Sequence, residues 1–160
     1  MIAAGGIADG RGMAAALALG ASAVWVGTRF LLADECNIHN EYRERIARAK
    51  ETDTVLSRLY DGGWEDAPNR CLKNETIAAW VAAGCPSTGN RPNEGETLAY
   101  DSSGNPIPHY DLQEPLEGFK GDVASMAMYA GQSAGLSNKT APVSEIITGM
   151  AEQAASILGG

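Results

Sequence analysis

Hydrophobic and polar positions at the start of the chain follow a pattern typical of a strand, a helix and a second strand. Short apolar runs cover Met1 to Ala4 and Ala23 to Val26. Between them the pattern predicts an alanine- and leucine-rich helix from about Gly10 to Leu19, with Asp9 as its N-cap. A glycine turn follows each apolar run, so the first 28 residues predict a βαβ unit.

The two glycine turns are the candidate ligand-binding site of this unit. Gly5 and Gly6 follow the first strand, and Gly27 and Thr28 follow the second. Two such turns at the carboxyl ends of adjacent parallel strands form a nest of N–H donors, which suits a phosphate dianion. The usual phosphate site of a (β/α)₈ barrel lies after strands seven and eight, and we assign these turns to those positions. The alternative is that the glycines serve only tight turns.

Apolar periodicity and turn residues predict further elements downstream. Helices are expected over about 34–50, 69–83 and 122–134, and from Pro142 to the end of the chain. A short strand is expected over 54–60, and a hairpin with strands 97–100 and 107–110 around Ser102–Asn105. The last helix has a long apolar stripe, which a barrel wall or a partner must cover: Val143, Ile146, Ile147, Met150, Ala154, Ile157 and Leu158.

The expected fold is α/β: the C-terminal β/α units of a TIM barrel, with a mostly helical C-terminal subdomain and a small hairpin. We divide the chain into three segments. Residues 1–50 form the last two β/α units, residues 51–121 a subdomain with a helix and the hairpin, and residues 122–160 helices that pack on the barrel. A complete barrel takes about 250 residues, and this chain has 160.

Composition and charge exclude several classes of binding partner. The net charge of −8 argues against nucleic acid or an anionic membrane surface as partner. No apolar run reaches the roughly 20 residues of a membrane span. Three cysteines, an odd number without CxxC spacing, favour a reducing cytoplasm over a disulfide framework. No metal ligand set is predicted.

Three stretches resemble one family. They are IAAGGIADGRGMAAALALGASAVWVGTRFLLADE from Ile2, DGGWEDAPNRCLKN from Asp61 and YAGQSAGL from Tyr129. Together they resemble the C-terminal portion of the nitronate monooxygenases, formerly called 2-nitropropane dioxygenases, which are FMN-dependent barrel enzymes. Related FMN barrels share a similar glycine turn, helix and closing strand, and the GTRF sequence at Gly27 narrows the resemblance to this family.

The resemblance implies which residues contact FMN. Carried over by position, they are Gly6, with the adjacent Gly5, and Trp25, Val26, Gly27 and Thr28. Trp25 is a departure, because the family often has Gln or Met there; its ring could stack near the flavin or fill the top of the barrel. The family's catalytic histidine lies on an earlier loop that this chain lacks, and neither His39 nor His109 matches it. No catalytic residue is therefore assigned.

Two polar residues near this region each have two possible roles. Arg29 could face the phosphate or pair with a carboxylate. Gln132 lies in a segment of small residues and could make a polar contact near substrate or flavin, or the segment could serve tight helix packing.

The implied reaction is FMN-dependent oxidation of an alkyl nitronate by O₂ to a carbonyl compound and nitrite. This chain would be the C-terminal part of the enzyme, with weak or no turnover alone. One alternative is another FMN-dependent barrel oxidoreductase, such as an enoyl reductase that uses NAD(P)H. The other is an inactive truncated product. The expected partners are the nitronate and O₂, with association either as a homo-oligomer or with the missing N-terminal part.

Overall fold

The computed structural model describes residues 1–62, 64 and 67–159. They form two compact units that interleave along the sequence. Unit 1 comprises Met1–Cys36, Ile46–Thr52 and Ala130–Gly160, and unit 2 comprises Asn37–Arg45 and Asp53–Tyr129. The division into residues 1–50, 51–121 and 122–160 stays a prediction.

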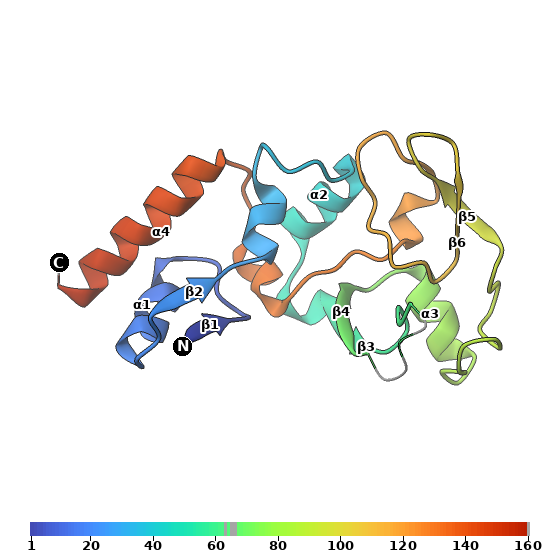
Figure 1. Cartoon of the computed structure of the whole chain (residues 1–160), viewed down its shortest axis with the longest axis horizontal. Helices are drawn as coiled ribbons and strands as arrows, with labels where there is room; N and C mark the ends of the chain where they lie inside the picture. Colours follow the sequence, from blue (N-terminus) through green and yellow to red (C-terminus); the bar gives the residue numbers. More distant parts are fainter. Residues whose placement is uncertain (63, 65–66, 160) are drawn as a thin grey trace. The chain divides into compact units, whose positions relative to one another are not determined.

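Unit 1 begins with the expected βαβ motif (Figure 1). Strand β1 (Ile2–Ala4) leads into helix α1 (Gly10–Ala18), which returns the chain to strand β2 (Ala23–Trp25). The two strands pair in parallel, with Ala3 opposite Val24. This pairing confirms the prediction and places both carboxyl ends at one edge of the sheet.

Helix α1 begins where Asp9 caps it. The Asp9 carboxylate accepts hydrogen bonds from the amides of Arg11 and Gly12, both at 3.1 Å, and pairs with the Arg11 guanidinium at 2.7 Å. These bonds satisfy first-turn amides that have no partner inside the helix. The helix ends before Gly20, whose φ of +96° reverses the chain toward β2.

Helix α4 (Val143–Leu158) packs on α1 at a point of very close approach. The Gly10 amide donates a hydrogen bond to Oε1 of Gln153 at 2.8 Å. A Cβ on Gly10 would lie 2.6 Å from the Met150 carbonyl oxygen and 2.7 Å from the Ala154 nitrogen, so only glycine fits there. Of the predicted stripe on α4, Ile146, Met150 and Ala154 are buried, whereas Ile147, Ile157 and Leu158 are exposed.

The region after β2 differs from the sequence prediction. A 3₁₀ helix covers Thr28–Leu32, and helix α2 spans only Asn40–Arg48 instead of 34–50. The helix starts late because Ala33 and Ile38 form bridges with Ala141 and Leu116, respectively, which keep this stretch extended. Nδ1 of His39 then accepts the Glu41 amide at 3.1 Å and caps the first turn of α2.

Unit 2 contains an antiparallel pair where part of a helix was expected. After a 3₁₀ turn (Glu51–Asp53), strand β3 (Thr54–Ser57) pairs with β4 (Asn69–Leu72), so the helix predicted over 69–83 is wrong in its first part. Helix α3 covers Glu75–Ala82, because the Asn74 side chain accepts the Ile77 amide and starts the helix there. Gly63, Glu65 and Asp66 of the quoted DGGWED stretch lie outside the described residues.

The predicted hairpin is confirmed. Strand β5 (Thr97–Tyr100) lies between β6 (Pro106–Pro108) and the two-residue β7 (Lys120–Gly121). The Asp101 carboxylate fixes the turn by accepting the amides of Ser103 and Asn105, both at 2.8 Å.

The helix predicted over 122–134 is wrong. Two 3₁₀ turns, Val123–Ser125 and Gln132–Leu136, flank an extended segment. The backbone of that segment is engaged elsewhere: the carbonyls of Ser125 and Met126 accept hydrogen bonds from the Asn74 side chain at 3.1 and 2.8 Å, and the Met128 carbonyl accepts the Leu72 amide. These tertiary bonds replace the helical ones. Within the part of the chain that the structure describes, no helix is both long and apolar enough to cross a membrane.

A matched pair of substitutions on α1 tests the close approach to α4. We expect Gly10→Ala to lower the free energy of unfolding by about 1–3 kcal/mol, because the new methyl overpacks the backbone of α4. Gly12→Ala is the control: its Cβ meets Ile7 only at 3.4 Å, so it should raise stability by up to about 1 kcal/mol through helix propensity. Denaturant unfolding measures both. Equal effects of the two changes would contradict this packing.

The Asp9 cap makes stability depend on pH. Burial raises the pKa of the Asp9 carboxyl, but the bonds and charge of Arg11 and the Gly12 amide outweigh it, so the pKa lies below its usual 3.8. The cap therefore contributes above the unfolded pKa and is lost as pH falls through the folded one. We expect Asp9→Ala to cost about 1 kcal/mol at pH 7 and almost nothing near pH 2. A difference that does not shrink in acid would contradict this role.

Candidate functional site

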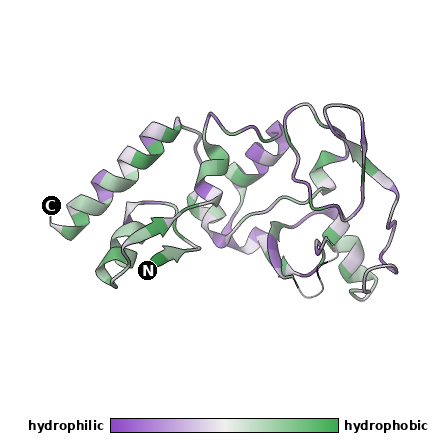
Figure 2. Ribbon diagram, viewed as in Figure 1, coloured by the Kyte–Doolittle hydropathy of each residue, from purple (hydrophilic) through white to green (hydrophobic). Residues whose placement is uncertain are grey.

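One face of the β1–β2 sheet is uncovered within unit 1. Side chains alternate along both strands: Ala3 and Val24 are half-buried, and Val26 packs against the cluster that α4 contributes to. The opposite side, which we call the open face, consists of exposed residues: Ile2, Ala4, Ala23 and Trp25. Figure 2 shows that both strands are built mainly of hydrophobic residues. In a barrel, one of these two alternating faces points to the interior.

The first glycine turn continues from β1. Gly5 and Gly6 have φ of +91° and +74°, which is left-handed backbone that favours glycine. Both are exposed, and a Cβ on either would meet no atom within 4 Å. Their conformation therefore requires glycine, and their amide groups lie in open surroundings.

The second glycine turn has a different character. Gly27 has φ of −108° and ψ of −74°, a right-handed backbone with negative φ, and a Cβ there would also meet nothing within 4 Å. Neither backbone conformation nor packing within the described residues demands glycine at this position. A bare backbone at such a place leaves room for the close approach of another group.

Thr28 and Arg29 add two donors beside Gly27. Oγ1 of Thr28 accepts the Gly131 amide at 2.9 Å, and no acceptor for its own hydroxyl hydrogen is found among the described residues. Nη1 of Arg29 is buried and has no hydrogen-bond partner in the described chain. Burial lowers the pKa of the Arg29 guanidinium. Of the two expectations for Arg29, pairing with a carboxylate does not occur within the described residues.

Trp25 lies on the open face directly opposite Ala4 in the parallel register. It is 71% exposed, which is unusual for so large an apolar side chain, and its cross-strand neighbour is small. The ring therefore has free space beside the first glycine turn. Its contact with FMN stays a prediction, as do those of Gly5, Gly6, Val26, Gly27 and Thr28.

The donor set fits a phosphate group. A phosphate dianion carries only acceptor oxygens, and it is bound in proteins by backbone amides, hydroxyls and guanidinium groups. The amides of the two turns, the Thr28 hydroxyl and the Arg29 guanidinium provide these three kinds of donor. No group of three or more His, Cys, Asp and Glu able to hold a metal ion is found in the described part of the chain.

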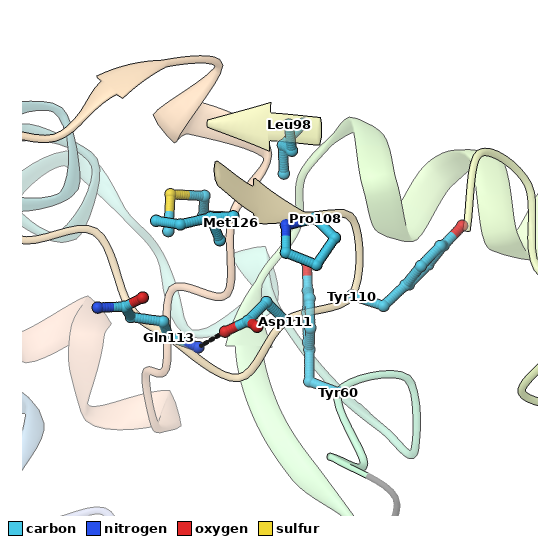
Figure 3. Close-up of a pocket in the computed structure, with 8 residues that line it drawn as sticks. Tyr60, Leu98, Pro108, Tyr110, Asp111, Gln113 and Met126 are labelled. Carbon is cyan, nitrogen blue, oxygen red and sulfur yellow. Dashed lines mark hydrogen bonds between the residues drawn. The ribbon is translucent and has the colours of Figure 1, made fainter. Parts of the chain in front are cut away.

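Two hollows lie among the described residues of unit 2 that include Tyr110, and the smaller of these two leaves no volume for a ligand. Figure 3 shows it, with Tyr60, Pro108 and Met126 among the side chains that fill it. Asp111 lies at its border, where its carboxylate accepts the Gln113 amide at 2.8 Å. This hollow is part of the packing beneath the hairpin.

The larger hollow, of about 460 Å³, includes Arg91, Asp61 and His109 in its lining. Arg91 pairs with Glu94 and with Asp61, and its guanidinium stacks 4.4 Å from the centre of the Tyr110 ring. These contacts engage the Arg91 guanidinium with the carboxylates of Asp61 and Glu94 and with the Tyr110 ring, which indicates a structural network. The volume lies within the range of ligand pockets, but the charges that line it serve the fold.

Sequence reasoning missed the contact between Gly131 and Thr28, which lie 103 residues apart. The small residues after Tyr129 indicated a close approach without identifying its target. Gln132 is exposed at the start of the 3₁₀ turn, and its role stays a prediction. His39 caps α2, which accounts for that histidine without catalysis.

Comparison with known proteins gives one consistent family. A family model described as nitronate monooxygenase matches residues 1–153. The probable nitronate monooxygenase of Staphylococcus saprophyticus is 34% identical over 140 residues, which cover 83% of this chain and 33% of that protein. A probable nitronate monooxygenase of Staphylococcus aureus strain Newman is 47% identical over 62 residues, 39% of this chain and 18% of that protein.

Two solved structures resemble the fold along nearly its whole length. FabK from Thermotoga maritima has a TM-score of 0.65 and 29% identity, covering 99% of this chain and 45% of that one. Nitroalkane oxidase from Streptomyces ansochromogenes has a TM-score of 0.66 and 26% identity, covering 99% of this chain and 40% of that one. The chain thus spans about a third of the first curated relative and less than half of either solved chain. Since the family model covers nearly all of its residues, the chain belongs to the nitronate monooxygenase family.

Proposed function

We propose that this chain provides the phosphate-binding end of an FMN site, in an enzyme that oxidises alkyl nitronates with O₂ to carbonyl compounds and nitrite. The observation that carries the proposal is Gly27. Its glycine is required by nothing within the described chain, and the next two residues present donors without acceptors. Family membership supports the reaction class.

Different residues of the chain bind different parts of FMN. The amides of Gly5, Gly6 and Gly27 and the hydroxyl of Thr28 donate to the phosphate oxygens, and the Arg29 guanidinium offsets part of their charge. The backbone of Val26 leads into this turn. Trp25 presents its ring to the flavin from the open face. When bound, the flavin supplies the redox chemistry of the reaction.

The residue that handles the nitronate is expected outside this chain. His39 is engaged as a helix cap, and His109 lies in the hollow of unit 2 that includes Arg91, not among the residues of the two glycine turns. We therefore infer weak or no turnover for the chain by itself.

Association is part of the proposal. Within the described residues, β1 and β2 form a two-stranded sheet, so each has one edge without a partner strand. Ile2 and Trp25, 59% and 71% exposed, add apolar surface. Preceding β/α units or a second copy would cover both edge and face. Cys36, Cys71 and Cys85 form no disulfide within the described residues, which fits a cytoplasmic protein.

Substitution of Gly27 tests the phosphate site. Gly27→Ala should leave the melting temperature unchanged, because the methyl meets nothing and φ is negative. It should weaken FMN binding about tenfold, or about 1.4 kcal/mol, because the methyl occupies space next to the phosphate. Riboflavin, which lacks the phosphate, should bind both proteins equally. Fluorescence titration gives the dissociation constants.

Gly149→Ala is the matched control, since a Cβ on this α4 residue also meets nothing within 4 Å and lies away from the glycine turns in sequence. It should not change FMN affinity. The proposal fails if the wild-type chain does not bind FMN, or if Gly27→Ala binds it as tightly as the wild type.

Oxygen consumption separates the proposed reaction from its alternatives. With FMN present, we expect the chain to show little or no nitronate-dependent O₂ uptake, because we assign none of its residues to catalysis on the nitronate. Robust uptake would contradict the idea of a missing catalytic part. Oxidation of added NADH would instead favour an enoyl reductase-like enzyme, and a flavin-free oligomer on size-exclusion chromatography would favour an inactive truncated product.

A further inference from the structure

We infer that Gly131 is a positioning residue for the flavin phosphate, acting through the hydroxyl of Thr28. This inference rests on the proposed function. The Gly131 amide donates to Oγ1 of Thr28 at 2.9 Å, and both residues lie in unit 1. The bond joins the second glycine turn to a segment more than a hundred residues later.

The bond decides what the Thr28 hydroxyl can do. A hydroxyl has one hydrogen to donate and two lone pairs to accept. The Gly131 amide occupies a lone pair, so the hydroxyl hydrogen must point away from Gly131. Thr28 is thereby prepared as a donor, and a phosphate oxygen, which only accepts, is the matching group.

Gly131 is itself held firmly within unit 1. Its carbonyl accepts the Ala134 amide at 3.0 Å, in a 3₁₀ turn whose Ser133 and Ala134 are buried. The Ser137 hydroxyl closes the turn by donating to the Ser133 carbonyl at 2.9 Å. A donor fixed by its own turn orients Thr28 before any ligand arrives, which lowers the entropic cost of binding.

The surroundings of Gly131 leave room for a small side chain. A Cβ on Gly131 would lie 3.4 Å from Oγ1 of Thr28, the near limit of ordinary contact. The backbone of Gly131 has φ of −76° and ψ of 172°, which any residue can adopt. Neither conformation nor space therefore demands glycine at position 131, so alanine can replace it while the amide donor is kept.

Proline at position 131 removes the donor while keeping the backbone angle. Because proline fixes φ near −65°, Gly131→Pro fits the observed φ; it removes the amide hydrogen and places its Cδ where that hydrogen pointed, so it breaks the bond and displaces the Thr28 hydroxyl. We expect the FMN dissociation constant to rise about five- to tenfold, with riboflavin affinity unchanged. Gly131→Ala is the matched control, which keeps the amide and should bind FMN within about twofold of the wild type.

A double-mutant cycle with Thr28→Val separates positioning from a general structural effect. If Gly131 acts through the Thr28 hydroxyl, Gly131→Pro should cause no further loss of FMN affinity once Thr28 is valine. Thr28→Ser, which keeps the hydroxyl, should retain most of the affinity. Losses that add independently would overturn the inference and leave the proposed function standing.

Two further outcomes are decisive. If the wild-type chain does not bind FMN, the proposed function fails and this inference fails with it. If Gly131→Pro does not fold, Thr28→Val tests the same bond from the other partner: hydrogen exchange of the Gly131 amide should become faster and FMN affinity should fall. Unchanged exchange and affinity would overturn the inference.

Discussion

The parallel pairing of β1 with β2 is the interaction on which the rest of unit 1 depends. Parallel neighbours need a crossover, and α1 provides it in the shortest usual form. The crossover brings the ends of both strands to one edge, so two glycine turns 20 residues apart in sequence become neighbours. Packing of α1 on α4 through Gly10 holds this arrangement, because a larger residue at Gly10 would overlap the α4 backbone.

Glycines in this unit serve three separate physical purposes. Gly5 and Gly6 supply left-handed backbone, and Gly10 supplies close helix packing. Gly27, like Gly149 on α4, serves neither purpose within the described residues, but only Gly27 follows a parallel strand and precedes the donors of Thr28 and Arg29. Gly131 belongs beside it, since it brings a backbone amide to Thr28. The candidate site thus combines two glycines that the backbone conformation requires, Gly5 and Gly6, with one that nothing in the described chain requires, Gly27.

Local sequence patterns predicted the elements that local forces decide. The βαβ unit, the Asp9 cap and the hairpin around Ser102–Asn105 depend on residues close in sequence, and all three are confirmed. The helix predicted over 122–134 and the first part of the helix predicted over 69–83 are wrong, because the Asn74 hydrogen bonds and the pairing of β4 with β3 join distant segments. Local patterns could not predict the contact between Thr28 and Gly131 either, because the two residues lie far apart in sequence. The glycine turns were found because their spacing follows the strand ends.

The central claim is that the two glycine turns hold the phosphate of a flavin mononucleotide. Backbone amide NMR during titration of the chain with FMN tests it most directly, because it reports every amide separately. The account predicts that the largest chemical-shift changes fall on Gly6, Gly27 and Thr28, with smaller changes when riboflavin replaces FMN. Unchanged amides at these three residues, with changes gathered around the Arg91 hollow of unit 2, would contradict it.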